Sequence, residues 1–288
     1  MKVGVVILNY NSWEMSANLA KKMASFSLID EVMIVDNSST DDSFERLQKL
    51  KYSKIEVVES EKNGGYSYGN NFGAKILIRN RCDYLIISNP DVDIEEKSIS
   101  KILNAFQNNK NFGVLSGIEY DIENKMSLPA VWRRNRYIDD LRECFYLGRK
   151  LKRKVPDIDY SCEIQSVEMV KGSFFVVKAK DFEEAKGFDE NVFLFCEERI
   201  LSRRILDIGK QIGIVTSAKY NHNHSASIHK EYKSITKQIR LLYKSRYYYN
   251  CCYNNINNVQ KLILFLGMKI SIIEYRFIDV IKMVGRRR

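Results

Sequence analysis

The 288-residue chain is 45% hydrophobic and 28% charged and has only three prolines, which is ordinary for a folded protein and argues against long disordered linkers. Its formal net charge of +10 is unevenly placed, because the surplus of basic residues lies in residues 199–288. A folded body with a basic tail therefore fits the chain better than a uniformly basic nucleic-acid binder, and we expect no nucleic acid as a partner.

Short apolar runs alternate with helix-like segments over the first 120 residues. Strands are predicted at Val3–Leu8, Val32–Val35, Ile55–Val58, Tyr84–Ile87 and Gly113–Ser116, and helices at Trp13–Phe26, Asp42–Leu50, Tyr66–Ile78 and Glu95–Gln107. The strand-like runs are continuously apolar, which predicts an α/β fold with a mainly parallel sheet covered by helices on both faces. Ligands bind such sheets beyond the carboxyl ends of the strands, so the residues that follow each strand matter most.

Polar segments follow four of these strands. They are Asn9–Asn11, Asp36–Ser39, Ser60–Gly65 and Ser88–Asp91. Any one of them has an ordinary explanation, because Asn, Asp and Ser favour turns. Four in succession, two of them with acids, favour instead a set of hydrogen-bonding groups directed at one crevice.

Two of these segments suggest more specific chemistry. The run from Gly64 to Gly73 lacks the spacing of a dinucleotide fingerprint, but its glycines would let the backbone approach an anion at a helix N-terminus. The run from Asn89 to Asp93 offers oxygen ligands at alternate positions after a buried strand, which suits a hard divalent cation. A proline turn with solvated acids is the alternative for this second run.

The next part of the chain is predicted to be irregular from residue 120 to 165, with clustered basic residues that suit either a solvated loop or a flap over a phosphate. A buried strand follows at Gly172–Val177, and then a helix-like stretch that ends at Gly187. Glu197 and Glu198 open a further helix, where an acid either offsets the macrodipole or acts as a general base.

The three histidines lie close together in the sequence. His222, His224 and His229 are the only histidines and lie within eight residues, so we expect one of them to complete a metal shell.

The six cysteines form no Cys-x-x-Cys pair, which fits reduced thiols in a cytoplasm. The chain begins directly with a strand-like run, so we expect no signal peptide.

The combined order of these motifs resembles the inverting family 2 glycosyltransferases of the GT-A fold, and within them the bacterial rhamnosyltransferase-like enzymes of surface polysaccharide synthesis. The resemblance spans about residues 3–228 and rests on Val5–Asn11, Val35–Asp41, Asn63–Gly73, Asn89–Val92, Gly187–Glu198 and His222–Ser227. It implies a GT-A domain at residues 1–228 and leaves residues 229–288 as a basic amphipathic helical tail.

The resemblance also implies roles for individual residues. The donor is expected to be a UDP- or dTDP-sugar, and the cofactor Mn²⁺ or Mg²⁺. Donor contacts are implied for Asn9, Tyr10, Asn11, Asp36, Ser38, Asn63, Gly65 and Asn89, with Asp36 accepting from a pyrimidine imide N–H. Asp91 and His222 are implied as metal ligands. Glu198 aligns with the catalytic base, although it replaces the usual Asp, and Glu197 is the alternative.

The tail has two amphipathic segments. Lys233, Lys237, Arg240 and Lys244 recur at helical spacing, and an apolar stripe runs from Ile263 to Val284 with too many charges for a membrane span. Such helices suit an anionic membrane surface, so we expect a protein that is cytoplasmic and peripheral on the inner face of the cell membrane and acts on a glycan or lipid-linked acceptor. Packing on the body or on another copy of the chain, as a homo-oligomer, is the alternative.

Two other functions remain open from the residues alone. A sugar-nucleotide pyrophosphorylase shares the nucleotide fold, but the first strand is not followed by a Gly-rich loop that contains Arg. A non-catalytic membrane-binding protein would explain the tail but not the polar crevice.

Overall fold

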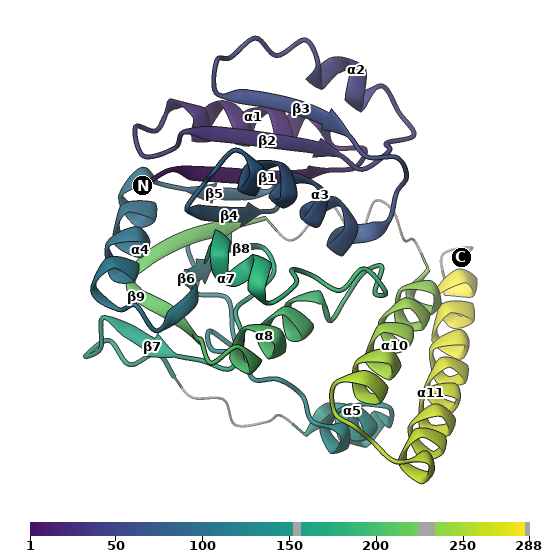
Figure 1. Ribbon diagram of the computed structural model, residues 1–288. Coiled ribbons are helices and arrows are strands. Elements are labelled where there is room, and N and C mark those ends of the chain that lie inside the picture. The colour runs from purple at the N-terminus through teal and green to yellow at the C-terminus, as the bar shows by residue number, and fades with distance from the viewer. Residues whose placement is uncertain (152–156, 224–233, 286–288) are drawn as a thin grey trace.

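The computed structural model describes residues 1–151, 157–223 and 234–285 of the chain. Its centre is one mixed sheet. Strand β7 (Ile164–Ser166) pairs with β9 but is not part of the main order of strands. That order is β3 (Ile55–Glu59), β2 (Glu31–Asp36), β1 (Val3–Asn9), β4 (Tyr84–Ser88), β8 (Phe174–Lys178), β6 (Phe112–Tyr120), β9 (Gln211–His222) and β5 (Val92–Ile94). Figure 1 shows helices on both faces of the sheet, as the sequence predicts.

Strands β1 to β4 are parallel and end at one edge of the sheet. The pairing places Asn9 beside Asp36, Asp36 beside Glu59, and Ile7 beside Ser88. The middle residues of β1, β2 and β4 are buried on both faces, which explains their continuous apolar character. The polar segments that follow these strands are therefore neighbours, as expected.

Two apolar clusters fill the space between sheet and helices. Helices α1 (Trp13–Ser25), α2 (Ser43–Leu47) and α4 (Glu96–Asn108) cover one face, where Val5 of β1 belongs to the first cluster. Helices α3 (Gly65–Arg79), α7 (Ala179–Glu184) and α8 (Glu197–Asp207) cover the other face, where the adjacent Val6 belongs to the second. Strand β8 runs antiparallel between β4 and β6, which makes the sheet mixed.

The segment from 120 to 165 is not wholly irregular, which corrects the expectation from sequence. It contains α5 (Tyr137–Glu143) and α6 (Tyr146–Lys150). At the start of α5, the backbone N–H of Arg136 donates to the carboxylate of Asp139 at 3.0 Å. Leu141 and Cys144 then pack in a cluster with residues of the tail helices. Helices this short depend on such tertiary contacts, so their own sequence pattern does not predict them.

The tail forms two helices, α10 (Ile235–Cys252) and α11 (Asn258–Gly285), which lie side by side in Figure 1. Helix α10 packs on the body, where Ser245 donates to Leu194 O at 2.7 Å and Arg246 pairs with Glu143 at 2.6 Å. The first tail segment therefore packs on the body, which is the alternative to membrane binding that the sequence leaves open. No helix in the described part of the chain is long and apolar enough to cross a membrane.

Candidate active site

A cavity of about 300 Å³ lies at the edge where the parallel strands end, and it is lined by residues from both halves of the chain. Most of the predicted site residues line it: Tyr10, Asn63, Gly65, Asn89, Asp91, Glu197, Glu198 and His222. The other predicted residues, which are Asn9, Asn11, Asp36 and Ser38, are not among its lining residues.

Asp36 is fully buried at the end of β2, and both its carboxylate oxygens accept hydrogen bonds. Asn9 Nδ2 donates to Oδ2 at 2.6 Å, and Ser39 donates from its backbone N and its Oγ at 2.8 Å each. Asn11 and Ser38 have φ values of 50° and 58°, in the left-handed region that residues other than glycine rarely adopt. In this arrangement these residues shape the loops after β1 and β2.

The start of α3 lies against the segment that precedes the two glutamates. Tyr66 N donates to Phe193 O at 2.9 Å. Gly65 has a φ of +84°, and a Cβ at this position would collide with the same carbonyl oxygen, so the close approach requires glycine. Asn63 Oδ1 accepts from Gly65 N at 3.1 Å and from Asn37 Nδ2 at 3.0 Å. Asn37 also lines the cavity, although the sequence did not single it out.

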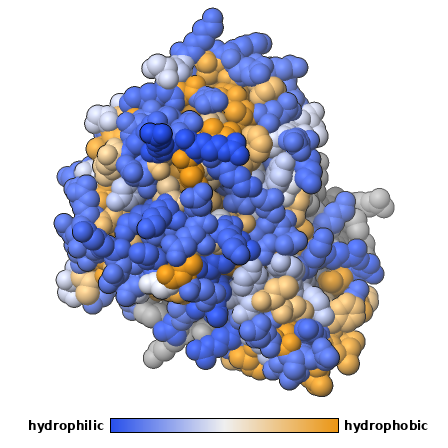
Figure 2. Space-filling view, in the orientation of Figure 1, coloured by the Kyte–Doolittle hydropathy of each residue, from blue (hydrophilic) through white to orange (hydrophobic). Residues whose placement is uncertain are grey.

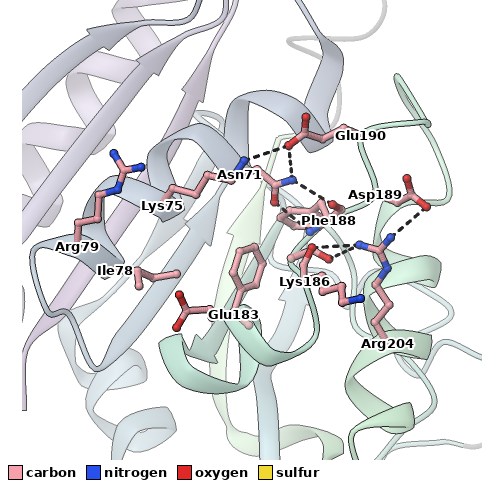
Figure 3. Close-up of a pocket in the computed structure, with 12 residues that line it drawn as sticks. Asn71, Lys75, Ile78, Arg79, Glu183, Lys186, Phe188, Asp189, Glu190 and Arg204 are labelled. Carbon is pink, nitrogen blue, oxygen red and sulfur yellow. Dashed lines mark hydrogen bonds and ion pairs between the residues drawn. The ribbon is translucent and has the colours of Figure 1, made fainter.

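Figure 3 shows how α3 and α8 hold the chain on its way to the two glutamates. Asn71 of α3 donates to Phe188 O at 3.0 Å and to Glu190 at 2.8 Å, and it accepts from Phe188 N at 2.9 Å. Arg204 of α8 donates to Gly187 O at 3.0 Å. A second cavity of about 570 Å³ lies here, but although it is larger, none of the predicted site residues lines it. We therefore place the candidate site in the smaller cavity.

Glu197 and Glu198 are the first two residues of α8. The preceding Phe195 and Cys196 have φ values of 71° and 69°, a backbone conformation that costs roughly 1–3 kcal/mol per residue. Glu197 is buried, and its Oε2 has no hydrogen-bond partner within the described residues. Backbone strain beside an unsatisfied buried carboxyl is typical of a functional site.

The pKa values of both carboxyls are raised. Burial raises the pKa of Glu197 well above its ordinary value, and the charge of Glu198 raises it further. Burial likewise raises the pKa of Glu198. A more basic carboxylate is a better acceptor for the proton of a hydroxyl group. Glu198 and Gly172 both line the cavity, so the carboxyl of Glu198 lies in its wall.

Asp91 and His222 meet where β5 pairs with β9. Val92 lies opposite His222 in the register, and Asp91 Oδ1 is 3.2 Å from His222 Nε2. Glu119 of β6 approaches the other ring nitrogen, with Oε2 3.4 Å from Nδ1. Burial lowers the pKa of His222, but the two carboxylates outweigh burial and raise this pKa to about 9.

Glu119 was not among the residues predicted from sequence. It is buried, and it accepts from Ser173 Oγ at 2.7 Å, Lys171 Nζ at 3.0 Å and Tyr220 OH at 3.1 Å. Burial opposes its ionisation, but the contacts with His222, Lys171 and Ser173 lower its pKa far below the usual range. The signal that could indicate it is a single charged residue inside an otherwise uncharged, buried strand.

The pair of Asp91 and His222 fits one hard divalent cation. Asp91 Oδ1 and His222 Nε2 form a hydrogen bond of 3.2 Å, and this separation is close to the about 3 Å between adjacent ligands of an octahedral ion at about 2.1 Å. Within the described ranges, no group of three or more His, Cys, Asp or Glu could hold a metal ion. Two protein ligands would leave the other positions to phosphate oxygens and water, as is usual for Mg²⁺. His224 and His229 lie outside the described residues.

The sequence matches one family model over more than half of its length. The model described as glycosyl transferase family 2 matches residues 4–174. The low-salt glycan biosynthesis hexosyltransferase Agl10 of Haloferax volcanii is 26% identical over 198 residues, which are 68% of this chain and 59% of that protein. The O-antigen chain rhamnosyltransferase WbaN of Salmonella anatum is 24% identical over 204 residues, 70% of this chain and 59% of that protein. The chain thus spans less than two thirds of the length of these relatives.

A solved structure has the same fold. The mannosyltransferase PcManGT from Pyrobaculum calidifontis, in complex with GDP-Man and Mn²⁺, matches with a TM-score of 0.60 at 12% identity. The match covers 94% of this chain and 72% of that chain. The GT-A fold that the sequence implied is thereby confirmed.

Proposed function

Because the chain belongs to glycosyl transferase family 2, we propose that it transfers a sugar from a nucleoside-diphosphate sugar to a hydroxyl group of a glycan or lipid-linked acceptor. The observation that carries this proposal is one cavity that holds both an acid pair, Glu197 and Glu198, and the pair of Asp91 and His222. Sugar transfer needs a base for the acceptor and a means to neutralise the leaving diphosphate. The names of the two relatives support hexosyl or deoxyhexosyl transfer in glycan synthesis.

We expect a single displacement with inversion at the anomeric carbon. The acceptor oxygen forms the new bond to this carbon while Glu198 takes its proton, and the bond from this carbon to the diphosphate breaks with its electron pair leaving on the diphosphate. A bound Mn²⁺ or Mg²⁺ would supply neutralisation of the charge that develops there. Glu198 is preferred to Glu197 because it is the less buried of the two residues.

We assign direct donor contacts to residues that line the cavity, which are Tyr10, Asn63, Gly65 and Asn89. The buried Asp36 acts in this proposal mainly by fixing Asn9 and Ser39. A pyrimidine imide remains its proposed ligand in a UDP- or dTDP-sugar, because a carboxylate has about four acceptor sites. The Pyrobaculum mannosyltransferase, with GDP-Man and Mn²⁺ bound, supports a nucleotide-sugar donor and a divalent metal.

We also propose that α11 attaches the protein to the inner face of the cell membrane. Large apolar side chains of α11 are exposed to solvent: Val259, Leu262, Ile263, Phe265, Leu266, Ile270, Ile273 and Phe277. In Figure 2 hydrophobic surface gathers at the lower right, where α11 and α5 lie in Figure 1. Exposed Lys269 and Arg276 on α11 and Lys237, Arg240 and Lys244 on α10 would favour anionic lipid.

The test is to incubate the purified protein with UDP-, dTDP- and GDP-sugars and to measure the release of free nucleoside diphosphate. We expect release from at least one donor, loss of release with excess EDTA, and recovery with Mn²⁺ or Mg²⁺. Asp91→Ala should be inactive. Full turnover in EDTA would contradict the metal dependence. Formation of sugar 1-phosphate with added pyrophosphate would indicate a sugar-nucleotide pyrophosphorylase, and absence of any turnover would favour a non-catalytic membrane-binding protein.

A further inference from the structure

The candidate site has an aromatic wall that the proposed donor contacts do not use. Trp132 lies in the loop between β6 and α5 and lines the same cavity as Glu198. Its neighbour Val131 is buried in the second apolar cluster, and Trp132 itself forms a bridge to Met169. The side chain is only partly buried, although tryptophan contributes a large apolar area when it packs in a core.

The indole ring lines the cavity and is held in place by contacts at its edge and over one face. Its Nε1–H donates to Pro129 O at 3.0 Å, within the same loop, so the polar edge of the ring is already satisfied. Lys171 Nζ lies 5.7 Å from the ring centroid and also bonds to Glu119. Because Lys171 lies over one face of the ring, only the other face can take an apolar ligand surface, and the ammonium and carboxylate groups lie close by. This combination suits a pyranose, which has an apolar C–H face and hydroxyl groups at its rim.

A short segment, Lys171 and Gly172, lies between Trp132 and the proposed base Glu198. Lys171 contacts Trp132, and the next residue, Gly172, faces Glu198. Trp132 and Glu198 thus flank the same short segment, whereas the proposed nucleotide contacts Tyr10, Asn63 and Gly65 come from the ends of β1 and β3. A base that takes a proton from the acceptor must have the acceptor next to it.

We propose that Trp132 is the stacking platform of an acceptor subsite that takes one pyranose ring of the glycan to be extended. This inference rests on the proposed function, in which Glu198 activates an acceptor hydroxyl. The subsite takes a sugar ring by its apolar face, so it selects a glycan acceptor over a simple alcohol.

The chain contains two tryptophans, which allows a direct measurement. In Trp13→Phe, Trp132 is the only tryptophan, and in the matched control Trp132→Phe the only one is Trp13, which lies on α1 beside Arg46. Methyl glucoside, galactoside, mannoside and rhamnoside are titrated into each variant in the presence of Mn²⁺ and UDP. We expect a saturable change of emission with at least one pyranoside in Trp13→Phe and none in Trp132→Phe. No response in Trp13→Phe, or equal responses in both variants, would overturn the inference.

A kinetic measurement adds a second criterion, with the octyl glycoside of the responding sugar as acceptor. Trp132→Ala should raise the acceptor KM about tenfold with a smaller change in kcat, and Trp132→Phe should recover most of the loss because it keeps an aromatic ring. An unchanged KM in Trp132→Ala would overturn the subsite. Failure of the proposed function is distinguishable, because it would appear as absent turnover of every nucleotide sugar tested in the unmodified protein.

Discussion

Glu119 Oε2 lies 3.4 Å from Nδ1 of His222, on the side of the ring opposite to Asp91. Glu119 is itself held by Ser173, Lys171 and Tyr220, so its carboxylate has a fixed position. A carboxylate on one imidazole nitrogen orients the ring and fixes which nitrogen is offered to a ligand. Here it presents Nε2 toward Asp91 and the cavity.

We therefore predict that Glu119→Gln weakens Mn²⁺ binding, although Glu119 is not proposed as a ligand. Loss of such an orienting carboxylate typically costs about 10–100-fold in metal affinity. The affinity can be measured from the electron paramagnetic resonance signal of free Mn²⁺ during a titration. Glu123→Gln is the matched control, because Glu123 is an exposed acid that forms an ion pair with Lys125. Equal Mn²⁺ affinity in Glu119→Gln and the control would contradict the orienting role.

The second prediction concerns the acid pair. Glu198→Gln keeps size and polarity but cannot take the acceptor proton, so kcat should fall by ~10²–10⁴-fold while donor affinity stays near normal. Glu197→Gln should lower kcat much less, because Glu197 is the more buried of the two residues. The measurement is kcat in both variants beside donor Kd from calorimetry. A normal kcat in Glu198→Gln with a large loss in Glu197→Gln would exchange the two roles.

The third prediction follows from the raised pKa of Glu197. The folded protein binds the proton of this carboxyl more tightly than the unfolded chain, whose pKa is near 4.5. Stability should therefore fall as pH rises from about 4.5 through the raised pKa, and it should be fully present below 4.5. Glu197→Gln removes this loss, so its melting temperature should exceed that of the unmodified protein at neutral pH and converge with it at acidic pH. A lower melting temperature at neutral pH would show that the Glu197 carboxylate stabilises the fold.

The fourth prediction concerns α11. The protein should co-sediment with vesicles that contain phosphatidylglycerol but not with pure phosphatidylcholine, and raised salt should release it. Truncation is a poor test, because Tyr248 and Tyr253 of the tail donate to Asp189 in the segment before the acid pair. The double variant Ile263→Asp with Leu266→Asp should instead lose binding.

Leu128→Asp is the control for that experiment, because Leu128 is an apolar residue that is even more exposed than Ile263 and Leu266 but is not part of α11. Equal sedimentation with both vesicle types would contradict an electrostatic membrane contact. A concentration-dependent dimer that the double variant abolishes would show that α11 covers a second copy of the chain.

The sequence predicts the parts of this site that depend on local patterns, but not the parts that depend on contacts between residues far apart in the chain. The strands and the polar ends of β1 to β4 follow from local apolar runs, so the sequence predicts that Asn63, Asn89 and Asp91 lie at this edge of the sheet, where they line the cavity. Glu119 was missed because its partners Lys171 and Tyr220 are remote in the sequence. The same limit applies to α5, which depends on contacts with the tail helices.

The last prediction separates two reasons why Gly65 must be glycine. Its φ is +84°, which alanine adopts only at a cost, and an added Cβ would also collide with Phe193 O. Gly209 has a similar φ of +75° with no atom within 4 Å of an added Cβ, so Gly209→Ala reports the backbone cost alone, roughly 1 kcal/mol. Gly65→Ala should be destabilised further, and it should lose kcat as well, because Phe193 lies on the segment that leads to Glu197 and Glu198. The measurements are urea unfolding and donor turnover for both variants. Equal unfolding free energies with normal turnover would mean that the contact between Gly65 and Phe193 does not position the acid pair.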